Sequence, residues 1–516
     1  MMNKTITKIF SLIILGFFLI NSINSYSQEE KKPLKWSYGI KDYGHGINNL
    51  GATDKYMLIQ INNKKPDIAI LSLTNFSIYK RIKAFSPKTN NQSLTYEKSI
   101  VFNNELIVLA NSTDKQYLLY YSIPKFNKIK TVEIGTIKSR IDISNEDYLN
   151  QFSIKKHSKK IELIKSKDKK SLMFLYNNCG LDSSEIINYV VHIINPDLND
   201  TTYSISFDQK YNHFNLLSSI ITDNGVPCFL YKQNIEDIEI VYNLYDGNTN
   251  QHIPIELPIE MYNPILVENR NDIVILSMSK FENSFGLLQY TYSNDMHQFE
   301  DVVFTKMDDE LRSENENDFE RDENDNIKWP IYNYYIDGSV LIDEDTRIVY
   351  GENYDLSRTI VNNKTRIRHT AKEIFFLVTN IQGDKLFYRT FPKLQYFENS
   401  DDQLPSWGSY IFMKNNEELH FIFQEDKTPF ELLTSKSYNQ KILKPKGKAD
   451  KTIDLTFSYS FDIRKKQWQD NIKSKTYPNS FISIDLGNGI YIIGSENKYD
   501  ATKQIFKFTK YKYSEN

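Results

Sequence analysis

Residues 213 to 258 read HFNLLSSIITDNGVPCFLYKQNIEDIEIVYNLYDGNTNQHIPIELP and hold four short apolar runs separated by turns. The cluster Asp246-Gly247-Asn248 is typical of the turn that joins two strands of a hairpin. Four short antiparallel strands make one blade of a β-propeller. The segment therefore predicts a propeller blade, with a β-sandwich of alternating strands and turns as the other possible architecture.

The centre of this segment, a polar turn followed by a short apolar run, recurs along the chain. Eight copies begin at Asp54, Asn103, Asp168, Asp223, Asn269, Asp343, Asn415 and Gly487. Repeats of a few tens of residues build propellers or arrays, and insertions explain the longer steps. We therefore expect one all-β domain over residues 28–516, a single propeller of four-stranded antiparallel blades. Eight blades are expected, or seven if two irregular units merge.

The two ends of the chain predict how the ring closes. The last repeat, which includes GNGIYIIGSEN at residues 487–497, has only three strands before the chain ends. Near the start, LKWSYGIK at residues 34–41 has no partner in its own unit. Because exposed strand edges invite unwanted pairing, we expect residues 34–41 to pair with residues 503–513 and complete the last blade.

The first 27 residues have the layout of a secretory signal peptide. Lys4 and Lys8 precede the apolar run Ile9–Ile20. A polar stretch with the small residues Ser25 and Ser27 follows, and cleavage is expected after Ser27. This run is short of the roughly 20 residues that a membrane-spanning helix needs. We therefore expect an exported protein, periplasmic or extracellular, with no integral membrane segment after cleavage.

Charge and cysteine content restrict the possible partners. The formal net charge of the 516-residue chain is -3 and becomes more negative when two lysines leave with the signal peptide, so nucleic acid is not expected as a partner. Export permits a disulfide between Cys179 and Cys228, but two small buried thiols are the preferred interpretation, because the repeats place the cysteines in neighbouring units at different points of the strand. We expect a monomer.

Three segments carry a family resemblance: DGSVLIDEDTRIVYGENY at 337–354, AKEIFFLVTNIQGDKLFYRTFP at 371–392, and SWGSYIFMKNNEELHFIFQED at 406–426. They resemble an uncharacterised family of secreted Bacteroidetes proteins with propeller-like repeats. The resemblance covers the middle and the C-terminal half of the chain. It implies a secreted propeller and transfers no activity, cofactor or site residue.

Catalytic signatures are missing from the sequence. It contains no H-E-x-x-H, no G-x-S-x-G, no phosphate-binding G-x-x-x-x-G-K and no Cys/His cluster with zinc spacing. Glu352 and Glu496 end two second strands at equivalent repeat positions, and paired carboxylates can hydrolyse glycosides. Repeat equivalence explains these residues equally well. No catalytic residue, metal or cofactor is predicted.

Long insertions favour one face of the expected ring as the binding surface. Loops that precede the first strand of a blade, or join its second and third strands, lie on one face, which we call the long-loop face. The insertions assigned to it are residues 135–158, 306–333, 353–371 and 392–408. Functional residues concentrate on such loops because a rigid scaffold positions them.

Two charged segments accompany these insertions. Residues 308–326 are strongly acidic, but Ile327 stands where a calcium loop needs glycine, so a solvated insertion is the preferred interpretation. A lysine cluster within residues 436–451 is assigned to the opposite face as a flexible loop.

The residues proposed to contact a ligand are two tryptophans, three arginines and one glutamate: Trp329, Trp407, Arg358, Arg366, Arg368 and Glu352. Flat aromatic rings suit sugars and peptides, although packing between blades would also explain the tryptophans. The arginines could hold an anion, pair with the acidic insertion or lie on a solvated hairpin.

The sequence thus predicts an exported, non-enzymatic binding protein whose ligand is a protein, peptide or glycan. A secreted polysaccharide hydrolase or lyase is the alternative.

Overall fold

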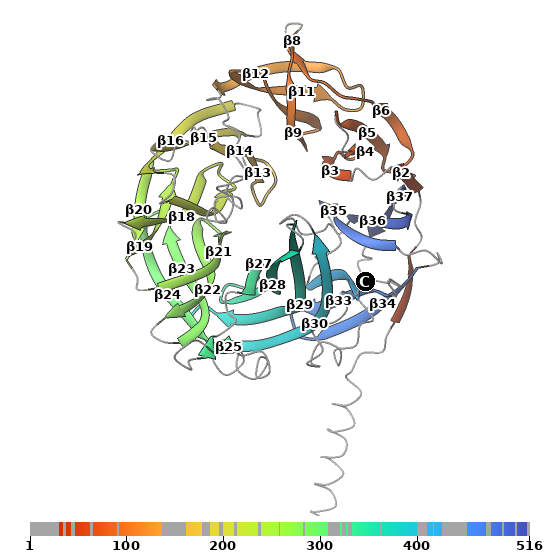
Figure 1. Cartoon of the computed structure of the whole chain (residues 1–516). Helices are drawn as coiled ribbons and strands as arrows, with labels where there is room; N and C mark the ends of the chain where they lie inside the picture. Colours follow the sequence, from red (N-terminus) through yellow and green to blue (C-terminus); the bar gives the residue numbers. More distant parts are fainter. Residues whose placement is uncertain are drawn as a thin grey trace, which may run out of the picture.

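The protein is a ring of β-sheets, as the computed structural model shows (Figure 1). The structure describes residues 30–34, 38–42, 47–61, 65–89, 92–136, 161–177, 186–195, 200–210, 214–235, 239–256, 259–281, 284–307, 320–321, 327–328, 333–361, 364–399, 410–415, 417–425, 451–470, 476–487, 490–500 and 503–512. Every regular element among these residues is a β-strand, apart from short turns. The fold class predicted from the sequence is confirmed.

The first four blades follow one another along the chain. Their strands are β3 Ile47–Ala52, β4 Tyr56–Ile61, β5 Asp67–Ser72 and β6 Ile78–Ile82; β9 Thr95–Phe102, β10 Glu105–Asn111, β11 Lys115–Ser122 and β12 Lys128–Thr136; β13 Ile161–Lys165, β14 Leu172–Asn177, β15 Ile186–Ile194 and β16 Asp200–Lys210; and β17 Phe214–Ile221, β18 Pro227–Ile235, β19 Glu239–Asp246 and β20 Gln251–Ile255. Each blade is a four-stranded antiparallel sheet with neighbouring strands in sequence order.

The remaining blades complete the ring. Their strands are β21 Ile259–Asn269, β22 Asp272–Phe281, β23 Ser284–Ser293 and β24 Gln298–Lys306; β27 Tyr334–Leu341, β28 Thr346–Val361, β29 Lys364–Asn380 and β30 Lys385–Asn399; β31 Ile411–Asn415, β32 Glu418–Glu425, β33 Lys451–Ser458 and β34 Ile463–Asp470; and β35 Thr476–Gly487, β36 Ile490–Asp500 and β37 Lys503–Lys512 with β2 Tyr38–Asp42. Two small two-stranded ladders lie in the segments of the chain that connect one blade to the next: β7 Lys88–Thr89 with β8 Gln92–Ser93, and β25 Glu320–Arg321 with β26 Ile327–Lys328.

The described residues therefore form seven four-stranded sheets and an eighth sheet of five strands. This fifth strand, β1 (Glu30–Leu34), adds in parallel to β34 at the outer edge of the seventh blade. Eight blades agree with the eight copies of the repeated sequence. Each copy forms the second strand of its blade: β4, β10, β14, β18, β22, β28, β32 and β36.

The repeated apolar run is continuous because both faces of a central strand are covered by neighbouring blades. In β10, Leu106, Val108 and Ala110 pack against the first blade. Ile107 and Leu109, the residues between them, pack against the third blade. Alternate residues of one strand thus contribute to two interfaces between blades, which we call seams.

The predicted closure of the ring is confirmed. Strand β2 pairs antiparallel with β37 from Tyr38↔Phe508 to Asp42↔Gln504 and supplies the outer strand of the eighth blade. At the inner edge, the Asn49 side chain donates a hydrogen bond of 3.2 Å to the Ser483 carbonyl, joining the first blade to the eighth. The predicted segment, residues 34–41, begins too early, because Leu34 belongs to β1 and β2 runs from Tyr38 to Asp42.

One loop assignment was wrong. The lysine-rich insertion follows β32 and precedes β33, the second and third strands of the seventh blade. Glu425 and Lys451, the residues at the two ends of the insertion, pair with each other. Because the insertion joins the second and third strands of its blade, it starts on the long-loop face and not on the opposite one. The lysines before Lys451 lie outside the described residues. Among the described residues, no helix is long and apolar enough to cross a membrane.

Candidate functional site

The sixth blade extends well beyond the other blades on the long-loop face. Strands β28, β29 and β30 contain 16, 17 and 15 residues and are the longest of the described strands. Strand β27 pairs with β28 only as far as Tyr334↔Asn353. Beyond Asn353, β28 and β29 continue as a hairpin that reaches Val361↔Lys364. Its eight further residues, 354–361, span about 25 Å at the usual rise of a strand.

This extension carries the three predicted arginines. Arg358 pairs with Ile367, while Arg366 and Arg368 pair with Thr359 and Ser357. Because successive residues of a strand alternate between the two faces of a sheet, positions 366 and 368 share one face and position 358 belongs to the other. The basic segment read from the sequence is therefore divided between two faces. Trp329, Trp407 and most of the acidic insertion lie outside the described residues.

Glu352 lies at the base of the extension and is buried, with 5% of its surface exposed. It pairs with Tyr335 in the same way that Glu496 pairs with Tyr477, so the predicted repeat equivalence of the two glutamates is confirmed. Neither residue ends its strand, contrary to expectation, because β28 continues to Val361 and β36 to Asp500. The seventh blade stands between them, so the fold gives no sign of a glycosidase pair.

A bulge in the inner strand places a second carboxylate near Glu352. The ladder between β27 and β28 skips Asp337, since Ile336 pairs with Gly351 and Gly338 with Tyr350. Bulges redirect side chains, and Asp337 is exposed although its strand lines the centre of the ring. The glycine at 338 is needed here, because a Cβ atom would lie 2.5 Å from the Tyr350 hydroxyl oxygen.

Tyr410, at the start of the seventh blade, joins the two carboxylates. Its hydroxyl donates a hydrogen bond of 2.5 Å to Asp337 Oδ2. Burial raises the pKa of Tyr410 well above its usual value, and the charges of Asp337 and Glu352 raise it further. Burial, followed by Asp337, also raises the pKa of Tyr350, whose ring stacks on Phe412 at 4.6 Å. Both phenols stay protonated at neutral pH, so neither acts as a base, and Tyr410 serves as a hydrogen-bond donor.

The same arrangement recurs at two other seams. The inner strands of three blades bulge at one residue: Leu50, Glu97 and Asp337. In each blade, the second residue beyond the bulge on the second strand is polar. These residues are Gln60, Asn111 and Glu352. We call this the repeat polar position. In the first seam, the Tyr96 hydroxyl of the next blade donates to Gln60 Oε1, at the repeat polar position. In the sixth seam, the Tyr410 hydroxyl of the next blade donates to the bulged residue Asp337 instead. Sequence reasoning missed Asp337, Tyr410 and Asn111 because bulges carry no sequence signal in this chain.

The described residues show no metal centre. They contain no group of three or more His, Cys, Asp or Glu side chains suited to a metal ion. Cys228 is a free thiol, fully buried in β18, and burial, followed by the charge of Asp246, raises its pKa. Its proposed disulfide partner, Cys179, lies outside the described residues. The buried, protonated Cys228 is therefore not an activated nucleophile.

Comparison with known proteins adds only structural likenesses. No family model matches the sequence, and no match is found among the curated proteins. A prolyl endopeptidase aligns with 92% of this chain and 55% of its own, at 8% identity and a TM-score of 0.35. The chain thus spans about half the length of that protein. The protein lmo1340 of Listeria monocytogenes EGD-e aligns over 87% of this chain and 100% of its own, at 10% identity and TM-score 0.35.

A third likeness is to the polysaccharide lyase Uly1, which covers 90% of this chain and 99% of its own, at 9% identity and TM-score 0.33. At such identities and scores, none of these activities transfers to this chain. The assignment to the β-propellers rests on the strand pairing of the eight blades.

Proposed function

We propose that the protein is an exported, non-enzymatic binding protein that engages a protein, peptide or glycan through the long-loop face of its propeller. Export is inferred from the signal-like residues 1–27, and the resemblance to secreted Bacteroidetes proteins agrees with it. The observation that carries the proposal is the three-stranded extension of the sixth blade.

The extension has a free edge suited to recognition. From Tyr354 to Val361, β28 pairs with β29 alone among the described strands. An unpaired edge presents a row of backbone N–H and C=O groups, to which an extended peptide can add as a further strand. Proteins normally shield such edges, so a long one that projects from a rigid ring favours a partner that covers it. This geometry supports a protein or peptide ligand more directly than a glycan.

A truncation tests the proposal without disturbing the ring. Tyr354 and Ala371 are paired in the ladder, so residues 355–370 can be replaced by Asn-Gly, which closes a two-residue hairpin. The full-length protein and the truncated variant are applied to peptide and glycan arrays and to a panel of polysaccharides. We expect binding by the full-length protein, loss of that binding in the truncated variant, and no polysaccharide cleavage by either.

The matched control changes the opposite face. Ile381 is 54% exposed in the turn between β29 and β30, and Ile381→Ser should leave binding unchanged. Turnover of any polysaccharide would contradict the non-enzymatic proposal. Equal binding by the truncated variant would remove the extension as the recognition element.

A further inference from the structure

The seam between the second and third blades contains two buried oxygen atoms with no hydrogen-bond partner. They are Oδ1 of Asn111 and Oε1 of Gln116, in side chains that are 5% and 2% exposed. Asn111 and Gln116 pair directly across β10 and β11, so their side chains lie on the same face of the sheet. Leaving such acceptors buried and unpaired destabilises the folded protein. Two together in one place require an explanation.

A carboxylate stands beside them. The Asn111 amide Nδ2 donates a hydrogen bond of 2.7 Å to Glu97 Oε1, which fixes the orientation of this amide and turns its oxygen away. Glu97 is the bulged residue of β9 and is only half-buried. All three residues lie near the turn between the second and third strands, on the long-loop face. We call Glu97, Asn111 and Gln116 the acceptor cluster, since it offers oxygen acceptors on three side chains.

The first seam shows what such a position normally holds. Gln60 occupies the repeat polar position there, as Asn111 does in the second blade. The Tyr96 hydroxyl satisfies Gln60, and burial raises the pKa of Tyr96 to about 12, so this donor keeps its proton. Among the described residues, nothing donates to Asn111 Oδ1 or Gln116 Oε1. In its described part, the second seam thus has the acceptors of the repeat without its donor.

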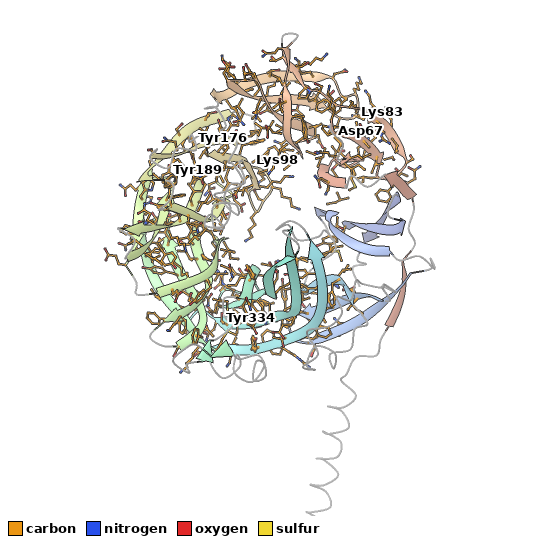
Figure 2. All side chains as sticks on the ribbon, viewed as in Figure 1. Asp67, Lys83, Lys98, Tyr176, Tyr189 and Tyr334 are labelled. Carbon is orange, nitrogen blue, oxygen red and sulfur yellow. The ribbon has the colours of Figure 1, made fainter. Side chains whose placement is uncertain are left out.

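Lys115, the neighbour of Gln116 in sequence, does not fill this gap. Lys115 precedes Gln116 on β11 and therefore belongs to the other face of the sheet. Its ammonium lies 2.9 Å from Glu133 Oε1 on that face. Tyr176, which lies where the second and third blades meet (Figure 2), donates instead to the Ile134 carbonyl at 3.4 Å.

We propose that the acceptor cluster binds a primary ammonium group of the ligand, such as a lysine side chain of a protein or peptide partner. This inference rests on the proposed function and narrows its ligand class. An ammonium carries three N–H donors and no acceptor, which matches three acceptor side chains, one of them charged. A divalent metal suits the cluster less well, because metals such as calcium take six to eight oxygen ligands, usually with several carboxylates.

The test uses n-butylammonium chloride as the probe, with n-butanol as its uncharged counterpart. Ligand-observed NMR and calorimetry on the full-length protein should detect n-butylammonium and not n-butanol. Gln116→Leu should abolish the binding and raise Tm by about 2 °C, since it removes a buried unpaired acceptor. Gln116→Glu should tighten binding several-fold because its carboxylate makes charge-assisted hydrogen bonds.

The matched control is Gln60→Leu in the first seam. This change removes the Gln60 acceptor of the Tyr96 hydroxyl and leaves only Ser99 Oγ, at 2.7 Å, as its partner, so it should lower Tm and leave ammonium binding unchanged. If Gln116→Leu does not fold, Gln116→Met supplies the same apolar replacement with a more flexible side chain.

Several results would overturn the proposal: no n-butylammonium binding by the full-length protein, equal binding in Gln116→Leu, equal binding of n-butanol, or a lower Tm in Gln116→Leu. A rise in Tm with calcium chloride but not with the amine would assign the cluster to a metal instead. The hairpin-truncated variant separates the two proposals. If the truncated variant still binds n-butylammonium but no longer binds the macromolecular ligand, both proposals are supported. If it still binds both, only the proposal that the extension recognises the ligand is contradicted.

Discussion

The two faces of the seventh blade differ sharply in chemistry. The face toward the sixth blade presents Phe421 and Phe457 in an apolar cluster, where the Phe376 and Phe457 rings stack at 4.6 Å and 7°. The opposite face of the same sheet buries His420 and Asp454, which are 3% and 1% exposed. One seam is therefore closed by apolar contacts, and the next contains buried groups that carry charge or hydrogen bonds.

The polar face depends on specific geometry. His420 Nδ1 lies 3.0 Å from Asp454 Oδ1 and 3.2 Å from the Thr456 hydroxyl, while Nε2 lies 3.5 Å from Glu418 Oε2. Apolar contacts tolerate small shifts, whereas hydrogen bonds between buried groups constrain the position of each atom. We infer that buried apolar area stabilises the seam between the sixth and seventh blades. On the opposite face of the seventh blade, the main contribution of the polar groups is to fix how this blade aligns with its neighbour. The predictions that follow test this difference.

The largest effect is expected from the apolar seam. Phe421 is fully buried and contacts the rings of Phe376, Tyr350 and Tyr410. Phe421→Ala should lower the free energy of unfolding by about 4 kcal/mol, because it removes buried area and leaves a cavity. Urea unfolding followed by fluorescence measures the change. The control Leu386→Ala, at a side chain 48% exposed, should change stability by less than about 0.5 kcal/mol.

A somewhat smaller loss is expected when the polar seam loses one partner. Asp454→Leu should cost about 3 kcal/mol, because His420 is left buried without its carboxylate. The double variant His420→Leu/Asp454→Leu should recover most of this loss, since an apolar pair of similar size needs no hydrogen bonds. A double variant as unstable as the single one in urea unfolding would show that the pair contributes more than alignment.

Removing the shared hydroxyl should have a modest effect. Thr456→Val keeps the size of the side chain and deletes one of two contacts to His420 Nδ1. We expect a loss of about 1 kcal/mol, the usual net value of one hydrogen bond. A loss close to that of Asp454→Leu would mean that the hydroxyl, and not the carboxylate, holds the histidine. The same urea titration provides the comparison.

The smallest effect is expected at the rim, in the turn between β13 and β14. Burial acts to raise the pKa of Asp168, but hydrogen bonds from Ser166 and Lys170 outweigh it and hold the pKa at about 2. The lowered pKa adds stability above about pH 4, and this contribution is lost as the pH falls toward 2. Asp168→Asn should therefore cost at most about 1 kcal/mol at pH 7. Thermal unfolding should show this difference shrinking at pH 2.5, and a constant difference would contradict it.

The repeated sequence predicted the architecture, because a continuous apolar run after each polar turn indicates a strand that is buried on both faces. DKYMLIQINN and NNELIVLANS are easily recognised, and they form β4 and β10. The parallel strand β1 was not foreseen, since EKKPL carries no alternation that marks a buried strand. Residues 353–371 were assigned as an insertion with a solvated hairpin as one interpretation of residues 357–371, and the structure shows such a hairpin. That it continues the blade was not foreseen, because its residues alternate without a continuous apolar run.

The candidate sites were less predictable for a different reason. Glu352 was selected from its repeat position, and the structure places it in a seam beside Tyr410. Asp337, Asn111 and Gln116 depend on a bulge or on a cross-strand partner, and neither can be read from one strand alone. An unpaired acceptor is a property of several segments together, so a linear pattern does not reveal it.

Ring closure also sets an order of events for the growing chain. Strand β2 is made near the start of synthesis, but Tyr38 must wait for Phe508 before it has a partner. Contacts so distant in sequence form slowly because a long loop must first be closed. We expect a stalled chain that ends at residue 500 to remain protease-sensitive in residues 38–42, whereas the released chain becomes resistant there. Equal resistance in both would show that the N-terminal strand docks before its partner exists.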